Sequence, residues 1–342
     1  MRVVFCIGAL WAVLSTVVVP ARAQFGDDNK AKTAPDKSKT KSKERAKDKD
    51  KDGPVAGGVK FGKQATQRWR VGVQIAAVGG PCYNVFATAA VPTDWPEQTV
   101  KIVKEEMSSH VGRVSYRTLE NGVKQMLVDI PQIPAGEMAQ ALVTFEVTRS
   151  AILPPDDPSV FKIPERLPRD VSKFLGPSPK VETRDPQIQK LAKEVAEGKD
   201  GAWEKVEAIY DWVRTNVEYK DCPVKGARAA LRDKSGYFED LTALFIAFCR
   251  VNKIPARTVW IPDHAYPEFY LVDDKGQGHW IPCQVAGTRD FGGIPEFRPV
   301  LQKGDNFKVP ETKEPQPLVA EFLRVKGGNP KCKFVRDLLP GN

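Results

Sequence analysis

Bulky apolar and polar side chains alternate along several short stretches between residues 59 and 150, with the two-residue period of a half-buried β-strand. The alternation is clear from Arg68 to Ile75 and from Ala141 to Thr148. Two further stretches flank Asn121-Gly122, and Asn-Gly is the strongest short signal for a β-hairpin. Short strands separated by turn signals predict a β-sandwich over residues 59–150.

Prolines mark residues 151–180, and helical periodicity follows them. A stretch so rich in proline is typical of a partly extended connector. Asp185-Pro186 then indicates a helix start, with Asp as the cap and Pro in the first turn, and this helix runs to about Glu197. A second predicted helix carries its apolar face at Trp203, Val206, Ile209, Tyr210, Val213 and Val217.

A third helix, expected from about Glu239 to Asn252, is apolar almost all round, which indicates that it is buried. Strand-like stretches follow at Ala256–Ile261, Glu268–Val272 and His279–Cys283. The predicted fold class is therefore α+β. The N-terminal β-sandwich is followed by helices packed on an antiparallel sheet over residues 181–342, including a C-terminal extension on the core.

The N-terminus has the pattern of a secretory signal peptide over residues 1–23. Arg2 supplies a positive start, Val3–Val19 is nearly all apolar, and Ala21-Arg22-Ala23 places small residues where signal peptidase needs them. We expect cleavage before Gln24 and a secreted or periplasmic protein with no stable membrane insertion. An uncleaved anchor is the alternative, although the apolar run is short for a membrane span.

Residues 24–58 have the composition of a disordered tether. Residues 24–53 carry ten basic and seven acidic side chains. A segment of this composition lacks the apolar surface whose burial would offset the conformational entropy that is lost on folding. A nucleic-acid arm would be more uniformly basic, which argues against a nucleic-acid partner. Of the net charge of +9, residues 1–53 supply +5. The small excess of positive charge on the rest of the chain would slightly favour binding to acidic surfaces such as cell-wall polymers.

Five of the six cysteines remain after removal of the signal peptide. An exported protein permits disulfides, but an odd count leaves at least one thiol unpaired or paired between molecules. No two cysteines have the CxxC spacing, which argues against a zinc ribbon. The five are Cys82, Cys222, Cys249, Cys283 and Cys332.

Four short motifs follow one another within residues 236–284: Gly236-Tyr-Phe-Glu-Asp240, Ile254-Pro-Ala-Arg257, His264-Ala-Tyr-Pro-Glu268 and Trp280-Ile-Pro-Cys-Gln284. Their order and spacing resemble the transglutaminase-like core of the papain-type thiol enzymes. In that core Gly-x-Cys-x-Asp opens a buried helix, Gly-Ile-Pro-Ala-Arg follows it, and a His-Ala-Trp-x-Glu strand precedes a strand with Trp and Asp. The resemblance covers residues 203–287, and the preceding β-rich region resembles N-terminal modules of bacterial members.

The resemblance implies a thiol site built from three positions. A cysteine at a helix N-terminus is favoured as thiolate, a histidine pairs with it, and a carboxylate or amide fixes the imidazole tautomer. Carried over, the nucleophile position is Phe238, the histidine is His264 and the orienting position is Gln284. Phenylalanine has no nucleophilic atom, so acyl transfer cannot run from this position. A glutamine can still accept the imidazole N–H.

Two other interpretations of these residues stay open. If Gln284 faces His264, its strand neighbour Cys283 points to the opposite face. Cys283 could therefore serve as a substitute thiol only if a bulge or a register slip reversed this alternation. Asp263, His264, His279 and Cys283 are residue types that bind metals. However, residues four apart on a strand lie about 13 Å apart, so we expect neither a metal nor another cofactor.

The sequence therefore predicts an exported, catalytically degenerate transglutaminase-like protein that keeps a peptide-accepting cleft as a binding or scaffold module. Its ligand would be a peptide or protein, cell-wall material included. The alternative is an active amide-bond enzyme, either a cysteine protease or a protein-glutamine acyltransferase, that uses Cys283 or another thiol with His264. A purely structural envelope protein is a third hypothesis.

Overall fold

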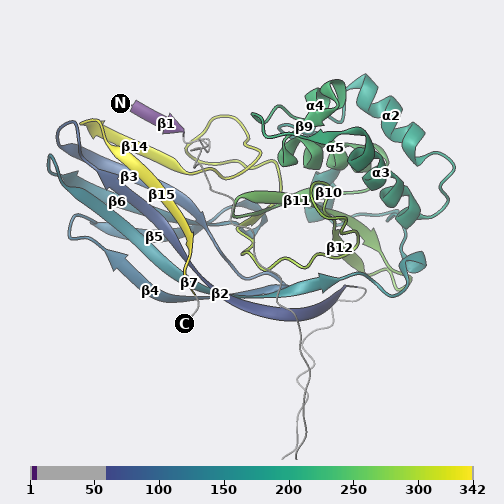
Figure 1. The fold of residues 1–342 in the computed structure, drawn as a ribbon, viewed down its shortest axis with the longest axis horizontal. Coiled ribbons are helices and arrows are strands. Elements are labelled where there is room, and N and C mark those ends of the chain that lie inside the picture. The colour runs from purple at the N-terminus through teal and green to yellow at the C-terminus, as the bar shows by residue number, and fades with distance from the viewer. Residues whose placement is uncertain (1, 6–58, 341–342) are drawn as a thin grey trace, which may run out of the picture. The chain divides into compact units, whose positions relative to one another are not determined.

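The computed structural model describes residues 2–5 and 59–340 (Figure 1). The predicted signal cleavage site at residues 21–23 and the predicted tether at 24–58 lie outside the described residues. Within the described part of the chain, none of the helices combines the length and the apolar character that a membrane crossing requires.

Two antiparallel sheets form the β-rich half, as the alternation predicts. Their strand orders are β1-β14-β3-β6-β5 and β15-β2-β7-β4. The longest strands are β2 (Lys60–Ala76) and β7 (Met138–Leu153), which pair along almost their whole lengths. The other strands are β1 (Arg2–Phe5), β3 (Cys82–Val91), β4 (Gln98–Met107), β5 (Arg113–Thr118), β6 (Lys124–Ile133), β14 (Phe322–Gly327) and β15 (Lys331–Leu338).

Apolar side chains from both sheets meet in one core. Val73 and Ile75 of β2 and Met126 and Val128 of β6 are all buried in the same cluster. Because inward-facing residues alternate with outward-facing ones, this cluster explains the period-two pattern of the sequence.

The hairpin predicted at Asn121-Gly122 is present between β5 and β6, where Glu120–Gly122 form a short 3-10 turn. Asn121 has a φ of 61° and Gly122 a φ of 77°. Asn and Gly tolerate this left-handed conformation better than other residues, and the turn closes with Leu119 N donating to Val123 O at 2.8 Å.

The last strands of the chain belong to the sandwich, which differs from the boundary of 181–342 expected from the sequence. Strand β14 pairs with β3, and β15 pairs with β2 from Lys331 opposite Ala76 to Leu338 opposite Trp69. Strand β1 adds to the other edge of β14. The physical reason is that β2 and β3 each have an edge whose backbone groups need partners, and distant segments can supply them.

Residues 151–180 connect the two halves and are packed against the core. Phe161, Val171 and Phe174 are buried. Lys162 and Val272 exchange two backbone hydrogen bonds of 2.8 and 3.0 Å. The connector is thus irregular, as its prolines predict, but its short elements are held in place: η2 (Pro158–Val160), α1 (Arg169–Ser172) and η3 (Lys173–Leu175).

The helix start predicted at Asp185-Pro186 is confirmed by the structure. The Asp185 carboxylate accepts hydrogen bonds from the backbone N–H groups of Gln187 and Ile188, at 2.9 and 3.1 Å. This helix, α2, spans Pro186–Ala196, and it is followed by α3 (Ala202–Asn216) and α4 (Ala227–Asp233).

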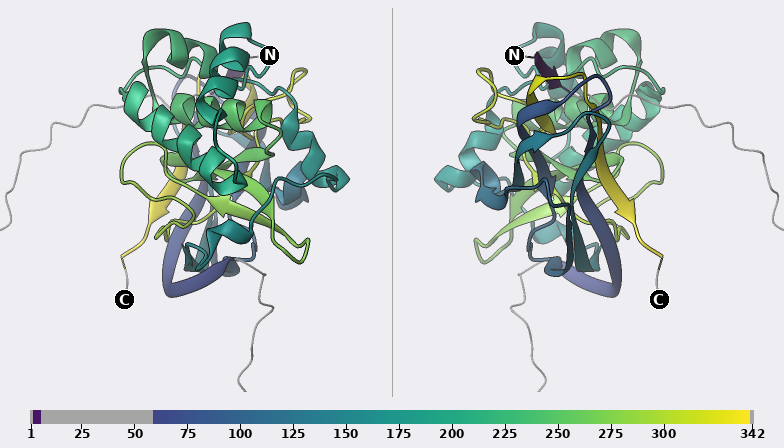
Figure 2. Two further views of the ribbon diagram at one scale, coloured as in Figure 1. Left: turned by 90° about the vertical axis from the view of Figure 1, so that its right-hand side faces the viewer. Right: turned by 90° about the vertical axis from the view of Figure 1, so that its left-hand side faces the viewer.

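The third predicted helix is α5 (Phe238–Val251), and it is buried along almost its whole length. It packs on a four-stranded antiparallel sheet with the order β12-β11-β10-β13. Helices α2 to α5 gather over this sheet (Figures 1 and 2). The α+β fold class predicted from the sequence is therefore confirmed. The strands of the sheet are β10 (Ala256–Ile261), β11 (His264–Val272), β12 (Gly278–Pro282) and β13 (Gln302–Lys303).

Candidate active site

The N-terminus of α5 is fixed by the carboxylate of Asp240, which is fully buried. Its Oδ2 accepts the backbone N–H of Tyr237 at 3.0 Å. Its Oδ1 accepts those of Lys225 and Gly226, at 2.8 and 2.7 Å. A methyl group at Gly236 would lie 2.7 Å from Asp240 Cβ, so only glycine fits beside this carboxylate. Gly236 and Asp240 of the motif therefore hold the first turn of α5 and its residue Phe238 in place.

His264 begins β11 directly after a tight turn in which Asp263 has a φ of 57°. Its ring meets the ring of Phe238 edge to face, with centroids 4.8 Å apart. Its Nε2 lies 2.9 Å from Gln284 Oε1. The structure thus brings Phe238, His264 and Gln284 together, in the arrangement that the motif spacing implies.

Gln284 follows β12 and is held through its backbone. Its N–H donates to Asp290 O at 2.7 Å. Its carbonyl accepts from Tyr210 Oη at 2.9 Å and from Arg214 Nη1 at 2.8 Å. Because Tyr210 and Arg214 both come from α3, this helix sets the position from which the Gln284 amide reaches the imidazole.

The surroundings of His264 favour the neutral form of its imidazole. Burial lowers the pKa of His264, the hydrogen bond to Gln284 opposes this effect, and the nearby Arg298 and Glu296 charges act in opposite directions. With Gln284 Oε1 as the acceptor, the proton of the neutral ring resides on Nε2. Nδ1 then carries a lone pair that can accept a hydrogen bond.

Cys283 lies away from this group, in the apolar core between α5 and the sheet. The side chain is fully buried, and its backbone N–H donates to Pro267 O at 3.1 Å. Burial raises the pKa of the Cys283 thiol well above its usual value. No bulge brings it round to His264, so strand alternation separates Cys283 from its neighbour Gln284, as the sequence suggests.

The residues considered as metal ligands are also separated. His279 pairs with Leu271 in the β11–β12 ladder, whereas His264 lies at the other end of β11. The His279 Nε2 atom instead lies 3.0 Å from Asp273 Oδ2, in a buried pair beside Phe161. Among the residues that the structure describes, no three His, Cys, Asp or Glu side chains are grouped as metal ligands would be.

Two further aromatic residues, which the sequence motifs do not identify as site residues, extend the site toward solvent. Tyr237 lies with its ring centroid 4.1 Å from that of Phe238, and Tyr219 lies 5.9 Å beyond it. Tyr219 is 51% exposed. The parallel pairing of β8 (Glu218–Tyr219) with β9 (Ser235–Gly236) brings Tyr219 beside the motif, a contact that no local pattern reveals.

Carboxylates lie near the row of rings that Tyr219, Tyr237 and Phe238 form. Burial, and then the nearby charges of Tyr219, Asp221, Glu239 and Asp263, raise the pKa of the Tyr237 hydroxyl. Burial and the neighbouring Asp240 raise the pKa of Glu239 to about 7, although Lys180 opposes this effect. Glu239 is therefore partly protonated at neutral pH, beside Phe238. From the sequence alone, Glu239 is expected only to mark the start of the helix.

A separate surface hollow lies at the end of α2 and includes none of the site residues. Its lining includes Lys193, Glu197, Lys205 and Asn252. This hollow is therefore not part of the site formed by Phe238, His264 and Gln284.

Comparison with known proteins agrees with this geometry. Residues 189–285 match the family model of the transglutaminase-like superfamily. The structure resembles that of a candidate cysteine protease from Cytophaga hutchinsonii, with a TM-score of 0.52 and 19% sequence identity over 80% of this chain and 92% of the other. At this identity the likeness shows a shared fold.

A candidate protease from Parabacteroides distasonis ATCC 8503 is more distant. It has a TM-score of 0.27 and 13% identity over 67% of this chain and 48% of the other. No curated protein matches the chain significantly.

Proposed function

We propose that this protein is an exported binding module whose transglutaminase-like domain holds a peptide segment at Phe238, His264 and Gln284 without thiol chemistry. The observation that carries the proposal is the contact between the rings of Phe238 and His264, at 4.8 Å between centroids. The phenyl ring stands where a thiol would have to meet the imidazole, and it offers no atom that can attack an amide.

The substitute-thiol alternative receives no support from the position of Cys283. A thiol acts as a nucleophile in its ionised form, and burial raises the pKa of this group. Its side chain lies in the apolar core, whereas the imidazole is bonded to Gln284. An amide substrate could not reach both groups without rearrangement of the sheet.

The row of rings supports a peptide as the ligand. Tyr219 is exposed, Tyr237 is half-buried, and the buried Phe238 contacts the half-buried ring of His264. Aromatic faces provide rigid, low-entropy contact area, and the free Nδ1 of His264 can accept a backbone N–H. The carboxylates of Asp221 and Asp263 near Tyr237 would complement positive groups on the peptide.

The proposed location is outside the cytoplasm, either secreted or periplasmic. Ala21-Arg22-Ala23 after an apolar run supports signal cleavage. The ligand would then be a peptide or protein of that compartment, including the peptide part of cell-wall material. The mixed charges of residues 24–53 give no support to a nucleic-acid partner.

An activity assay separates the binding module from the enzyme. The full chain is incubated with casein and with a primary-amine probe, and both peptide cleavage and amine incorporation are measured. We expect neither. Turnover that disappears in Cys283→Ser would instead establish the substitute-thiol enzyme and overturn the proposal.

A binding assay tests the site directly. A random-peptide display library and purified peptidoglycan sacculi are offered to the full chain, and enriched ligands are measured against Tyr219→Ala. Loss of an aromatic contact should weaken binding about tenfold. The matched control is Tyr83→Ala, because Tyr83 is 42% exposed on β3 and is not in the row of rings. Equal losses in both variants, or no enriched ligand, would contradict the proposal.

A further inference from the structure

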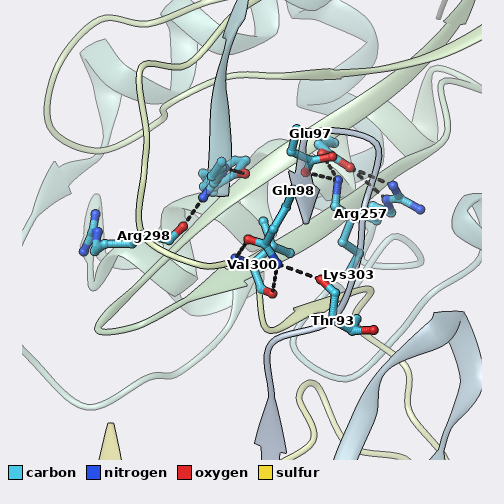
Figure 3. Close-up of polar contacts among 10 residues, drawn as sticks. Thr93, Glu97, Gln98, Arg257, Arg298, Val300 and Lys303 are labelled. Carbon is cyan, nitrogen blue, oxygen red and sulfur yellow. Dashed lines mark hydrogen bonds and ion pairs between the residues drawn. The ribbon is translucent and has the colours of Figure 1, made fainter. Parts of the chain in front are cut away.

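The segment of residues 294–303, which links the Gln284 region to β13, is attached to the β-rich half (Figure 3). Ile294 and Ile152 of β7 exchange two backbone hydrogen bonds, at 3.0 and 2.8 Å. Gln98 of β4 holds Val300 from both sides, because its Nε2 donates to Val300 O at 3.0 Å and its Oε1 accepts Val300 N at 2.7 Å. The segment is therefore placed by strands of the sandwich.

The same segment holds the turn that precedes His264. Arg298 Nη1 donates to Pro262 O at 3.0 Å. The Arg298 guanidinium is itself oriented by Glu296, with Nη2 to Oε2 at 2.6 Å. The charges of both Arg298 and Glu296 act on His264. A shift of this segment would thus move the backbone two residues before the imidazole and alter its electrostatic surroundings.

Arg149 of β7 joins the segment to the strand that carries the histidine. Its side chain is fully buried, although arginine is almost never buried without partners. Nη1 donates to the carbonyl of Arg298, and Nη2 donates to Tyr266 Oη at 2.7 Å. Tyr266 lies two residues after His264, and Arg298 contacts Pro262 two residues before it, so Arg149 is linked to both sides of the imidazole, directly through Tyr266 and indirectly through Arg298.

A second buried link holds β11 further along. Lys303 Nζ lies 2.7 Å from Glu97 Oε1 and 2.8 Å from Glu268 Oε1. Arg257 completes the group, with Nη2 2.9 Å from Glu268 Oε2 (Figure 3). Glu97 precedes β4, so this ion-pair chain also runs from the sandwich to β11. Burying these charges is costly unless each is paired, which ties the two halves to one relative placement.

We infer that the β-rich half completes the histidine site, and that Arg149 is a positioning residue for His264 that acts through Arg298 and Tyr266. Arg149 does not touch the imidazole. It holds the turn before His264 and the tyrosine after it, so that the ring stays packed on Phe238 and bonded to Gln284. This inference does not depend on which ligand the site binds.

The test measures the titration of His264 in the full chain by NMR. The chain contains three histidines, so His110 and His279 serve as internal references and His264→Gln assigns the third signal. In Arg149→Met the turn is released and water reaches the imidazole. The pH at the midpoint of the His264 titration should therefore rise toward the ordinary value for histidine. The midpoints of the His110 and His279 titrations should stay unchanged.

Two variants that perturb Arg149 and its partner less should shift the His264 titration less. Arg149→Lys keeps the charge but has no planar fork for two acceptors, and Tyr266→Phe removes only the hydroxyl. Each should raise the His264 midpoint by less than Arg149→Met does. The matched control is Arg68→Met, because Arg68 pairs with Glu146 on the exposed side of the sandwich at 3.1 Å. It should leave the His264 midpoint where it is.

An unchanged His264 midpoint in folded Arg149→Met would overturn the inference. An equal shift of His279 would overturn it as well, because it would indicate general loosening of the fold. If Arg149→Met does not fold, unchanged midpoints in both Arg149→Lys and Tyr266→Phe lead to the same conclusion.

Discussion

The side chain of Phe238 lies where a thiol would feel the positive end of α5, and its neighbours are those that such a thiol would need. The imidazole of His264 contacts its ring, and Gln284 accepts the imidazole N–H. Asp240 holds the backbone of the turn. The features that lower a thiol pKa at a helix N-terminus are therefore present around a residue that has no thiol.

Phe238→Cys should consequently create a reactive thiol. We expect its pKa to lie below the free-cysteine value of about 8.5, because the helix end and His264 both favour the thiolate. The measurement is the iodoacetamide alkylation rate as a function of pH, resolved by peptide mass spectrometry. The half-buried Cys222 of the same molecule is the reference. A residue-238 thiol that reacts no faster than Cys222 would show that the site has lost more than its nucleophile.

Glu239 should make folding stability depend on pH. Its pKa is about 7 in the folded state and 4.5 ordinarily, so between these values the folded state binds more protons than the unfolded state. Stability should therefore fall as pH rises through this window. The loss is at most about 3 kcal/mol, and less where water screens the carboxylate.

The comparison that isolates this contribution is Glu239→Gln, which cannot ionise. The urea midpoints of the parent and the variant are measured from pH 4.5 to 7.5. The variant should gain stability relative to the parent as the pH rises. Parallel profiles for the two proteins would show that Glu239 ionises normally in the folded state.

At the scale of elements, α5 is placed by its ends and by its burial. Its apolar surface fills the core between the other helices and the sheet. Its first turn is joined to the start of α4 by Asp240, which accepts the N–H groups of Lys225 and Gly226 as well as that of Tyr237. One carboxylate therefore connects the loop before α4 to the residue that precedes Phe238.

Asp240→Ala should destabilise the protein by about 3 kcal/mol, because three backbone donors lose their acceptor in a buried place. Asp240→Asn keeps one oxygen and should lose less. Chemical denaturation measures both. Asp233→Asn, at an exposed carboxylate on α4, is the control and should have a much smaller effect. A loss in Asp240→Ala no greater than in this control would refute the role of the carboxylate.

At the scale of the whole molecule, the described residues belong to one unit in which the chain passes through the sandwich, the transglutaminase-like domain and the sandwich again. Strands β14 and β15 pair with β3 and β2, and residues 294–303 are bonded to β4 and β7. The two halves therefore share strands and buried charges.

A fragment of residues 59–155 should fail to fold cooperatively. Without β14 and β15, the edges of β2 and β3 lose their partners and part of the sandwich core is exposed. Thermal unfolding followed by circular dichroism should show no sharp transition for the fragment, but one for residues 59–342. A sharp transition of the fragment would show that the β-rich half is an independent domain.

Export should remove the first 23 residues and with them β1 (Arg2–Phe5), so that β14 becomes the edge strand of its sheet in the mature protein. The mass of the mature protein should correspond to a chain that begins at Gln24, because Ala21 and Ala23 provide the small side chains that the peptidase recognises. Mass spectrometry of the protein from the producing cell measures this. A mature chain that keeps Arg2 would exclude cleavage.

The sequence by itself determined the features that depend on near neighbours along the chain. The period of two predicted β2 and β7, Asp185-Pro186 predicted the start of α2, and apolar residues all round predicted the burial of α5. The motif spacing placed Phe238, His264 and Gln284 in one group, because each follows a recognisable helix or strand boundary.

Only the tertiary structure decided which distant segments meet. The choice of β2 and β3 as partners for β15 and β14, and the approach of Tyr219 to Tyr237, have no local signal. Neither has the bond from Arg149 to Tyr266. Strand edges need partners for their backbone groups, and buried charges need partners of opposite charge or hydrogen-bond acceptors. In the folded chain, residues far apart in the sequence supply these partners, so the local sequence does not predict the contacts.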